Sequence, residues 1–469
     1  MSQRSRITNK SIDWITLTVF FSLLIIGWLM LYASVYDSKV PHAYLSFDST
    51  IGKQTVWVVI ALVSFVLVYA IDWQFWNTFA FPIYGAAIFL LILVLLIGTE
   101  IKGARSWFSF GGVSFQPSEI AKFATALAVS GFLSSYKSDI RTRNSMLISF
   151  GLIALPMSFI LLQSDAGSAL IFLSFFVLFY RRGLTPLMYI LGFSIAAIFI
   201  GSLVFEPQVV VLAVALVGIG TLIYNIGETW RSAIIFFFIS SISVLLYLRD
   251  LYWIGMSVVV VAIIGYTFLM FQEREFRTLT LVLPTILLSS ILAFGSTLAF
   301  ENLLEPHQQD RINVWLRPEK SDPRGARYNI IQSKLAIGSG GVQGKGFLKG
   351  EMTNLNYVPE QTTDFIFSTV GEEQGFIGSF GVIFLFTLLI VRIVIIAERA
   401  KNVFIQNYAY CVAGIFFLHF FINIGMALGI MPVIGIPLPF LSKGGSALLG
   451  FTIMIAVLLR MDVARFRSS

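Results

Sequence analysis

The chain has 469 residues, of which 57% are hydrophobic and only 12% are charged, and its mean hydropathy is +0.85. Because a soluble fold cannot present this composition to water, the sequence indicates a polytopic membrane protein. The net charge of +7 is not evidence for nucleic-acid binding, which would need a basic patch with aromatic platforms or a recognisable module. The single cysteine, Cys411, excludes an intramolecular disulfide framework and, within an apolar run, is expected to be a buried thiol.

Apolar runs long enough to cross about 30 Å of hydrocarbon predict the membrane spans. The first run, 15–34, is about 20 residues long and fits a retained spanning helix better than the core of a cleaved signal peptide. The complete set predicts fourteen spans, at 15–34, 54–71, 77–97, 118–134, 146–162, 166–181, 184–206, 208–224, 231–247, 251–271, 277–299, 370–396, 404–427 and 440–459. Since several runs are short, the even number of spans is a firmer prediction than the count. The predicted fold class is an all-α, polytopic integral membrane helix bundle, with residues 1–469 forming a single membrane domain.

The basic residues of the short loops and tails predict the orientation of the bundle, because such residues are enriched on the cytoplasmic side. If the N-terminus is cytoplasmic, seventeen of them fall inside and five fall outside. The five outer residues are Lys39, Lys53, Lys102, Arg105 and Arg249. Both termini are therefore predicted to lie in the cytoplasm, and the long polar segment 300–369 is predicted to lie outside as one large extracytoplasmic loop.

The first polar motif at a predicted outer span end begins at Gln116 and enters a helix whose start Pro117 and Ser118 mark. Glu119 and Lys122 follow at i, i+3, on one face of that helix. One interpretation is a local ion pair that hides two charges from lipid. A functional site is the other, since ionisable groups at membrane depth usually serve a pathway, a pair or a site.

The second motif is a polar hinge around Asp165, where an aspartate at a helix start could be an ordinary N-cap. The predicted orientation puts it on the same outer face as the third candidate, Asp364, which follows Thr363 just before an apolar run. Those two residues could cap the next helix, and Glu372 and Glu373 beyond them could form a surface run. A carboxylate at an outer membrane mouth, where water is partly excluded, also suits acid and base chemistry.

Several cofactor motifs are rejected from the sequence. The glycine-rich stretch 338–346 departs from the phosphate-loop pattern, because Gly346 stands where Ser or Thr should follow Lys345, so no nucleotide site is expected. The three histidines include no pair at metal-ligand spacing, so neither zinc nor haem is expected. A divalent cation held by carboxylates and phosphates remains open. Three prolines and three glycines within 432–445 predict a broken, re-entrant connection before the last span.

Five blocks, in order between residues 103 and 450, together resemble the family of shape, elongation, division and sporulation proteins, and its elongation branch more than its division branch. The blocks are FQPSEIAK at 115–122, QSDAG at 163–167, NIIQSK at 329–334 leading to GKG at 344–346, PEQTTDFIF at 359–367 and PLPFLSKGGS at 437–446. The family has ten spans, so the four extra spans predicted here imply an insertion within 184–299.

The resemblance implies a multi-pass peptidoglycan glycosyltransferase of the bacterial cytoplasmic (inner) membrane, which polymerises lipid II on the outer face during cell elongation. It assigns the essential carboxylate to Asp364 and functional importance to Glu119, Lys122 and Asp165. The implied partners are lipid II, the nascent glycan strand, a class B penicillin-binding protein that acts as transpeptidase, and other membrane proteins of the elongation complex. Nucleic acid is not among them. Along the chain it implies four segments, namely N-terminal family spans at 1–183, spans with the insertion at 184–299, a large extracytoplasmic catalytic loop at 300–369 and C-terminal family spans at 370–469.

Within this implied chemistry each site residue has an expected role. Asp364 would take the proton of the acceptor hydroxyl, or hold a Mg²⁺ or Mn²⁺ ion that bridges to the diphosphate. Lys122, oriented by Glu119, would stabilise the departing diphosphate. Weaker candidates for substrate contact are Arg105, Gln116, Arg311, Lys345, Glu360, Ser442 and Lys443.

Three positions depart from the family pattern. Thr362 stands where the family usually has His, Ser106 where it has Arg, and Lys443 where it has Tyr. No histidine can therefore assist Asp364 locally. Two functions of other classes remain as alternatives, a lipid II flippase or transporter that uses the same intramembrane charges and a non-catalytic scaffold of the elongation machinery.

Overall fold

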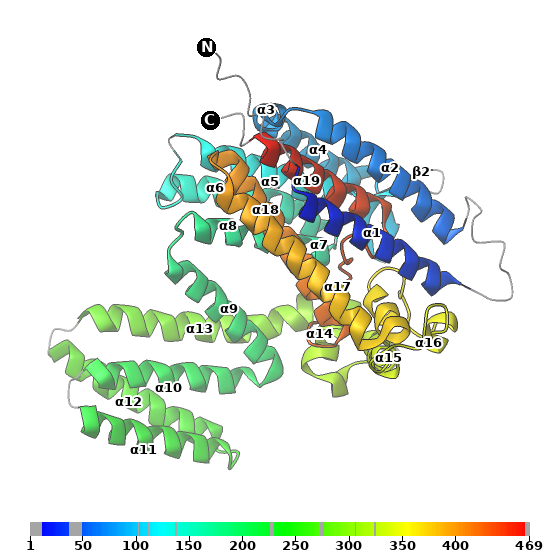
Figure 1. Ribbon diagram of the computed structural model, residues 1–469. Helices are drawn as coiled ribbons and strands as arrows, with labels where there is room; N and C mark the ends of the chain where they lie inside the picture. The colour runs from blue at the N-terminus through cyan, green and yellow to red at the C-terminus, as the bar shows by residue number, and fades with distance from the viewer. Residues whose placement is uncertain are drawn as a thin grey trace. The chain divides into compact units, whose positions relative to one another are not determined.

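The computed structural model describes most of the chain, and Figure 1 shows how its helices are arranged. The described residues are 12–36, 49–101, 103–110, 113–136, 138–225, 229–272, 276–304, 306–322 and 325–464. Contacts divide the chain into two compact units, which are described separately: unit 1 comprises Met1–Thr185 and Asp322–Ser469, and unit 2 comprises Pro186–Ser321. The first division lies close to residue 184, the predicted start of the segment that contains the insertion.

Unit 1 contains most of the spans that the family resemblance implies. Its helices are α1 (Trp14–Val35), α2 (Thr50–Ala70), α3 (Trp73–Thr78), α4 (Ala80–Ile97), α5 (Pro117–Ser134), α6 (Arg143–Leu162), α7 (Ala166–Ile171), η2 (Phe172–Phe175), α8 (Phe176–Arg181), α15 (Ala326–Ser339), α16 (Glu351–Asn354), α17 (Ile366–Arg399), α18 (Val403–Ala427) and α19 (Gly445–Ala464). The prediction of an all-α helix bundle is thereby confirmed for this unit, apart from one small sheet.

The sheet occupies the polar chain between α4 and α5. Its strands β1 (Thr99–Ile101), β2 (Ala104–Phe110) and β3 (Val113–Phe115) pair antiparallel in the order β1-β2-β3. Side chains alternate across β2, so Arg105 is exposed whereas Ser106 is buried. An arginine at position 105 therefore faces the opposite side of the strand from one at position 106, the position at which the family has its arginine.

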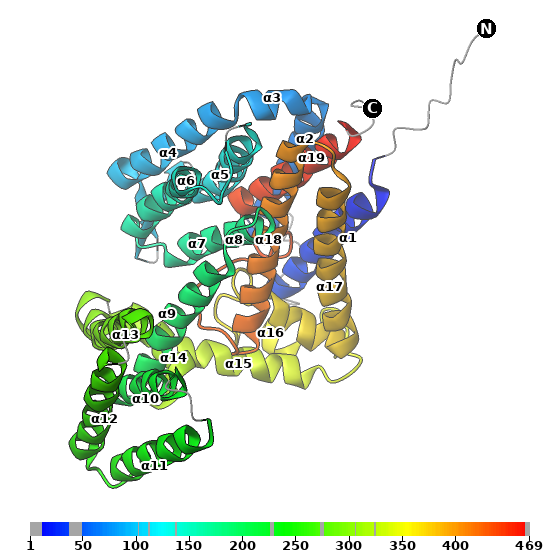
Figure 2. The same ribbon diagram turned by 90° about the vertical axis from the view of Figure 1, so that its left-hand side faces the viewer.

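Helices α5, α18 and α19 form the core of unit 1. Helix α18 packs against α5, α17 and α19, and α19 packs against α2, as Figure 2 also shows. Of their most apolar stretches, 72% of α18 and 78% of α19 is buried, against 22% of α2. Outer helices thus turn apolar faces outward, where lipid would cover them. The core helices instead enclose polar side chains, of which Glu119, Lys122, His419 and Asn423 are all at most 2% exposed.

Helix α17 contains a break at Gly375, which has φ 64° and ψ −156°. The glycine-rich stretch 338–346 lies against this break and exchanges backbone hydrogen bonds with α17 on both sides of it. These bonds run from Lys345 N to Glu372 O (3.1 Å), Gly346 N to Glu373 O (2.9 Å), Phe376 N to Gly341 O (2.9 Å) and Ile377 N to Val342 O (3.1 Å). A Cβ at Gly344 would lie 2.1 Å from the carbonyl oxygen of Glu373, so the contact requires glycine. The stretch that resembles a phosphate loop is a main-chain contact with α17, which we call the glycine seam.

Unit 2 holds the five predicted spans of the segment 184–299, and all five are helices. Its elements are α9 (Pro186–Val204), α10 (Pro207–Asn225), α11 (Thr229–Tyr247), α12 (Tyr252–Gln272), α13 (Phe276–Leu303), α14 (Pro306–Leu316) and η3 (Pro318–Lys320). Within the unit, α10 lies between α13 and the α11–α12 pair (Figure 1). Two buried clusters join these helices, Leu212 with Ala215 and Val259, and Leu222 with Met270 and Leu279.

Each of the fourteen predicted spans coincides with a helix. Among the described residues, eleven helices are long and apolar enough to cross a membrane. The other predicted spans correspond to the shorter helical runs at 166–181 and 233–247 and to α5, which carries Glu119 and Lys122. The chain is therefore a multi-pass membrane protein, while the number of helices that cross the membrane and the side of the termini stay predictions.

Charged side chains join the helix ends that are predicted to face the cytoplasm. Asp13, the N-cap residue of α1, lies 2.5 Å from Arg392 and 2.7 Å from Arg399, both on α17. Arg399 also lies 2.5 Å from Asp462 on α19. Since α17 starts beside Asp364 and ends at this network, the predicted outer and inner polar residues of unit 1 lie at opposite ends of the same helix.

Asp13 gives this network a dependence on pH. Burial would raise the pKa of its carboxyl, but the N–H of Thr16 and the hydrogen bonds and charges of Arg392 and Arg399 together hold the pKa below its ordinary value. Such a group contributes stability above its unfolded-state pKa of about 3.9, and the contribution is lost as the pH falls through the folded-state pKa.

We therefore expect Asp13→Asn to lower the free energy of unfolding by about 2 kcal/mol at neutral pH, because two arginines lose a charged acceptor. Thermal unfolding of wild type and variant checks this, and the two unfolding temperatures should converge below about pH 4. A difference that stays constant from neutral to acidic pH would contradict the role of Asp13.

Candidate active site

Asp364 lies at the end of a turn that leads into α17. Glu360 has φ 56°, and its carbonyl accepts the N–H of Asp364 at 3.1 Å, so the chain winds back just before the helix. Helix α17 starts at Ile366 with Phe365 as its N-cap residue, so the alternative that Asp364 caps this helix is wrong. The Asp364 side chain is partly buried, which is the environment that acid and base chemistry needs.

Asn423 of α18 fixes the backbone of Asp364. Its Nδ2 donates to the carbonyl oxygens of Asp364 (2.9 Å) and Ile436 (2.7 Å). Ile436 belongs to the segment 432–445, which is irregular as predicted. In the same segment Gly435 has φ 77°, and a Cβ there would lie 3.4 Å from Asp364 Oδ2. The carboxylate therefore lies close to the irregular connection between α18 and α19.

The far end of the same connection binds the residues that precede the carboxylate. The hydroxyl of Ser442 donates to the carbonyl of Thr363 at 2.5 Å, and the N–H of Lys443 donates to the carbonyl of Thr362 at 2.8 Å. Ser442 is only 6% exposed, so it holds this turn rather than offering its hydroxyl to a substrate. Contact of the Lys443 ammonium with substrate stays a prediction.

A further set of contacts, which the sequence analysis missed, anchors the turn to α1 and α17. Gln361 Nε2 donates to the carbonyls of Ser34 (2.8 Å) and Thr353 (3.0 Å). Thr353 in turn donates from N (2.8 Å) and Oγ1 (2.7 Å) to Glu372 Oε2. Lys345 Nζ donates to Glu372 Oε1 at 2.8 Å, and this hydrogen bond raises the pKa of Lys345. This series of contacts links the Lys345–Glu372 ion pair to the turn of Asp364.

These contacts correct one alternative and give the partners of one candidate residue, whose contact with substrate stays a prediction. Glu372 and Glu373 are both fully buried, so the alternative of a surface run is wrong. Lys345 was a candidate for substrate contact, but its ammonium is engaged by Glu372 and by Glu351, which lies 3.5 Å away. Its position follows from the glycine seam, whose backbone bonds place it directly beside α17.

Glu119 and Lys122 form the predicted ion pair in the first turns of α5. Lys122 Nζ lies 2.9 Å from Glu119 Oε2, 2.9 Å from His419 Nε2 and 5.4 Å from the ring centroid of Phe451. Because these groups enclose Lys122, which is 0% exposed, the ammonium does not face an open site. The geometry favours the interpretation of a neutralised pair over direct contact of Lys122 with a diphosphate.

The motifs around Gln116 and Asp165 meet at the start of α5. Gln116 Nε2 donates to Asp165 Oδ2 at 2.7 Å, and Asp165 Oδ1 accepts the N–H of Ser168 at 3.0 Å. Asp165 is therefore the N-cap residue of α7, as the alternative interpretation predicted, and also a partner of Gln116. The N–H of Arg105 donates to the carbonyl of Gln163 at 3.1 Å, so β2 lies against the same hinge with the Arg105 side chain exposed.

The connection between α18 and α19 joins this group to Asp364. A Cβ at Gly167 would lie 2.8 Å from the carbonyl oxygen of Ile434, and the next residue, Gly435, faces the carboxylate of Asp364. The hinge of Asp165 and the turn of Asp364 thus approach adjacent residues of one segment. Three motifs from distant parts of the sequence gather at one end of unit 1.

Two further residues predicted to contact the substrate are Arg311 and Glu360. Arg311 is on α14, in unit 2. Glu360 Oε2 accepts the hydroxyl of Thr363 at 3.1 Å, within the turn itself. His419 and Asn423 were missed, although a signal existed, since they are polar residues four apart in the apolar run 404–427.

Asp364 is the predicted ligand for a divalent cation at this site. Among the residues described, no three His, Cys, Asp or Glu side chains are arranged to hold a metal by themselves. Mg²⁺ is commonly bound by one or two carboxylates together with substrate phosphates and waters. Asp364 fits that mode, in which the substrate supplies the other ligands.

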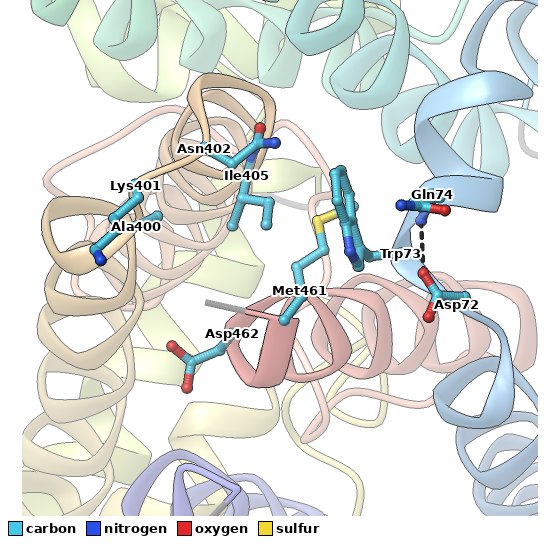
Figure 3. Close-up of a pocket in the computed structure, with 10 residues that line it drawn as sticks. Asp72, Trp73, Gln74, Ala400, Lys401, Asn402, Ile405, Met461 and Asp462 are labelled. Atoms are coloured by element: carbon cyan, nitrogen blue, oxygen red, sulfur yellow. Dashed lines mark hydrogen bonds between the residues drawn. The ribbon is translucent and has the colours of Figure 1, made fainter. Parts of the chain in front are cut away.

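A cavity of about 260 Å³ lies at the opposite end of unit 1 and contains none of the predicted site residues. Trp73, Met461 and Lys401 are among its lining residues (Figure 3). Its two carboxylates are already paired, Asp72 with Arg460 and Asp462 with Arg399. The candidate chemistry therefore belongs to Asp364 and not to this cavity.

The sequence matches a known family along nearly its whole length. The profile of the FtsW, RodA and SpoVE cell cycle proteins matches residues 13–217 and 208–467. The chain is 32% identical to the peptidoglycan glycosyltransferase RodA of Treponema pallidum, over 96% of this chain and 97% of that protein. It is 31% identical to the peptidoglycan glycosyltransferase MrdB of Escherichia coli, over 96% of each.

Solved structures share the fold. One is a chain from a study of how a peptidoglycan synthase complex coordinates polymerization and crosslinking, with a TM-score of 0.62, 24% identity and coverage of 97% of this chain and 99% of that one. Another is the crystal structure of the rod shape determining protein RodA of Thermus thermophilus, with a TM-score of 0.56, 22% identity and coverage of 98% and 99%. From these matches, the chain belongs to the FtsW, RodA and SpoVE family of cell cycle proteins.

Proposed function

We propose that the protein is a peptidoglycan glycosyltransferase that joins lipid II disaccharides into glycan strands during cell elongation. The proposal rests on the hydrogen bonds that hold the turn of Asp364 in place. Contacts from Asn423, from Ser442 and Lys443, and from Gln361 hold its turn from three sides. A turn whose backbone is held in this way presents its carboxylate from a fixed position, which suits catalysis because catalysis depends on preorganised groups.

In the proposed reaction the 4-hydroxyl oxygen of the acceptor sugar attacks the anomeric carbon of the donor. The bond from that carbon to the diphosphate oxygen breaks, with inversion, and the electron pair leaves with the lipid diphosphate. Asp364 accepts the proton of the attacking hydroxyl. Arg105, exposed beside the hinge of Asp165, and Lys443, beside the turn of Asp364, are the cations that we assign to the diphosphate.

A Mg²⁺ or Mn²⁺ ion is part of this proposal, with Asp364 as its protein ligand. Held by Asp364, such an ion would supply positive charge that stabilises the leaving group. Asn423 and the turn at Glu360 would then orient the carboxylate toward the ion as they orient it toward a proton.

The direct test uses the purified full-length protein in nanodiscs with lipid II, Mg²⁺ and a class B penicillin-binding protein as the proposed partner. Electrophoresis of the products should show glycan polymer, and chelation with EDTA should prevent its formation. Wild-type protein that forms no polymer with the partner present would end the glycosyltransferase proposal. If EDTA did not reduce polymer formation, the metal ion would be excluded from the proposal, but the glycosyltransferase activity would not.

The proposal places Asp364 on the outer face of the bacterial inner membrane, where lipid-linked sugars and the growing strand meet. Single cysteines can test this because the native Cys411 is 0% exposed. We expect a membrane-impermeant maleimide to label Glu351→Cys in intact cells, since Glu351 is 81% exposed near the proposed outer end. Lys401→Cys, exposed at the other end of α17, should react only after permeabilisation. The reverse pattern would contradict the orientation.

A further inference from the structure

His419 lies between the buried pair of α5 and the irregular connection that adjoins Asp364. Its Nε2 is 2.9 Å from Lys122 Nζ, and its Nδ1 is 3.1 Å from the carbonyl oxygen of Pro437. The edge of its ring contacts Phe451, with centroids 4.8 Å apart. At 1% exposure the imidazole is closed off from solvent, and both nitrogens contact polar groups.

The two contacts fix the proton of the imidazole. A carbonyl oxygen can only accept, so Nδ1 must carry a hydrogen and donate to Pro437. A lysine ammonium can only donate, so Nε2 must be unprotonated and accept from Lys122. His419 is therefore a neutral imidazole with its proton on Nδ1, and the backbone of the irregular connection sets this tautomer.

We propose that His419 is a positioning residue for Lys122, completing the hydrogen bonding of the buried ammonium and so keeping the Glu119–Lys122 pair charged and in one geometry. A buried ammonium with a single acceptor tends to lose its proton or to move toward water, because burial disfavours the charged form. The neutral imidazole supplies a second acceptor without adding a charge. The inference rests on the proposed function, in which the family resemblance makes Lys122 important.

Helix α18 connects this pair to the catalytic carboxylate. Asn423 follows His419 at i+4, on the same face of the helix. The two side chains bind consecutive carbonyls of one segment, His419 that of Pro437 and Asn423 that of Ile436. Asn423 also binds the carbonyl of Asp364. A movement of the Glu119–Lys122 pair would therefore shift α18 and, through Asn423, the turn that carries the Asp364 carboxylate.

Two substitutions separate the contacts of His419. The amide nitrogen of Asn occupies the place of Nδ1, so His419→Asn keeps a donor for Pro437 but leaves Lys122 without its second acceptor. The amide oxygen of Gln occupies the place of Nε2, so His419→Gln keeps the acceptor for Lys122 but loses the bond to Pro437. Polymerisation of lipid II and the unfolding temperature are measured for both variants and for wild type in the same nanodiscs.

We expect His419→Asn to lower kcat about tenfold with KM nearly unchanged, and His419→Gln to stay within about threefold of wild type. A residue that only packs, or only ties down Pro437, would give equal losses or the reverse order. Either result, or losses that simply follow the unfolding temperature, would overturn the proposal.

A second measurement does not depend on turnover. Because the chain has only three histidines, ¹⁵N-histidine labelling gives few signals, and the signal missing from His419→Gln identifies residue 419. Solid-state NMR should show that its proton is on Nδ1. A proton on Nε2, or on both nitrogens, would exclude acceptance from Lys122. If wild type forms no polymer, the proposed function fails in that assay, while the tautomer still decides the contact with Lys122.

Discussion

Asp364→Asn is expected to reduce glycan polymerisation by about 10³-fold, because an amide cannot accept the proton of the attacking hydroxyl. The substitution preserves the size of the side chain and leaves the Asn423 contact intact, since that contact uses the carbonyl oxygen of residue 364. The amide is also a poor ligand for a divalent cation, so base catalysis and metal holding both predict the loss. Polymer formed per unit time from lipid II, at saturating substrate, is the quantity to measure.

The matched control is Asp139→Asn, which removes an exposed carboxylate beyond the far end of α5. It should polymerise lipid II as wild type does. The unfolding temperature of Asp364→Asn should stay within a few degrees of wild type, which shows that chemistry rather than folding is lost. If Asp364→Asn retained a tenth or more of the wild-type rate, Asp364 would be neither the base nor the holder of an essential ion.

Glu372→Gln is expected to lower the free energy of unfolding by about 3 kcal/mol, because it replaces a fully buried carboxylate and leaves the donors that surround it without their acceptor. The Glu372 carboxylate accepts four hydrogen bonds, from Lys345 Nζ, Met352 N, Thr353 N and Thr353 Oγ1. An amide of the same shape has one oxygen, so its NH₂ group would face donors. Polymerisation should fall as well, since Thr353 holds Gln361 and through it the turn of Asp364.

Lys345 offers a control for this prediction because it has two glutamate partners. Glu351 is 81% exposed and 3.5 Å from the ammonium, whereas the Glu372 side chain is 0% exposed and 2.8 Å away. Glu351→Gln should change the free energy of unfolding by less than about 0.5 kcal/mol, as exposed ion pairs contribute little. Thermal unfolding of Glu372→Gln and Glu351→Gln under the same conditions measures the difference in stability. Equal effects would show that the burial of Glu372 is not what stabilises the segment around Lys345 and Thr353.

The membrane helices can be predicted well from the sequence, because each spanning helix corresponds to a local run of apolar residues. Helices α9 to α13 of unit 2 each coincide with a predicted run, to within a few residues at their ends, even though the family resemblance did not explain them. The sheet at 99–115 was not predicted, since its strands of three to seven residues are too short for an alternating pattern to stand out.

The site was predicted only in part. Asp364, Gln116 and Asp165 lie in motifs that are continuous in the sequence, and the structure gathers them at one end of unit 1. The partners of these motifs come from far away, as with Lys122 and His419, which are 297 residues apart. The seclusion of Lys122 also depends on Phe451, which a local pattern cannot reveal. The sequence shows which polar groups are costly to bury, whereas the fold decides which of them face one another.

The glycine seam has a consequence for how this protein can vary. Its hydrogen bonds join main-chain atoms, and a methyl group added at Gly340 or Gly344 would lie 2.0 or 2.1 Å from the carbonyl oxygen of Gly371 or Glu373 and force the two segments apart. Substitutions that change the catalytic rate or the unfolding temperature are therefore expected at neighbouring residues such as Thr353 and Gln361, and not at these glycines. A related sequence that lost the close contacts at Gly340 and Gly344 would therefore also displace the residues that support the turn of Asp364.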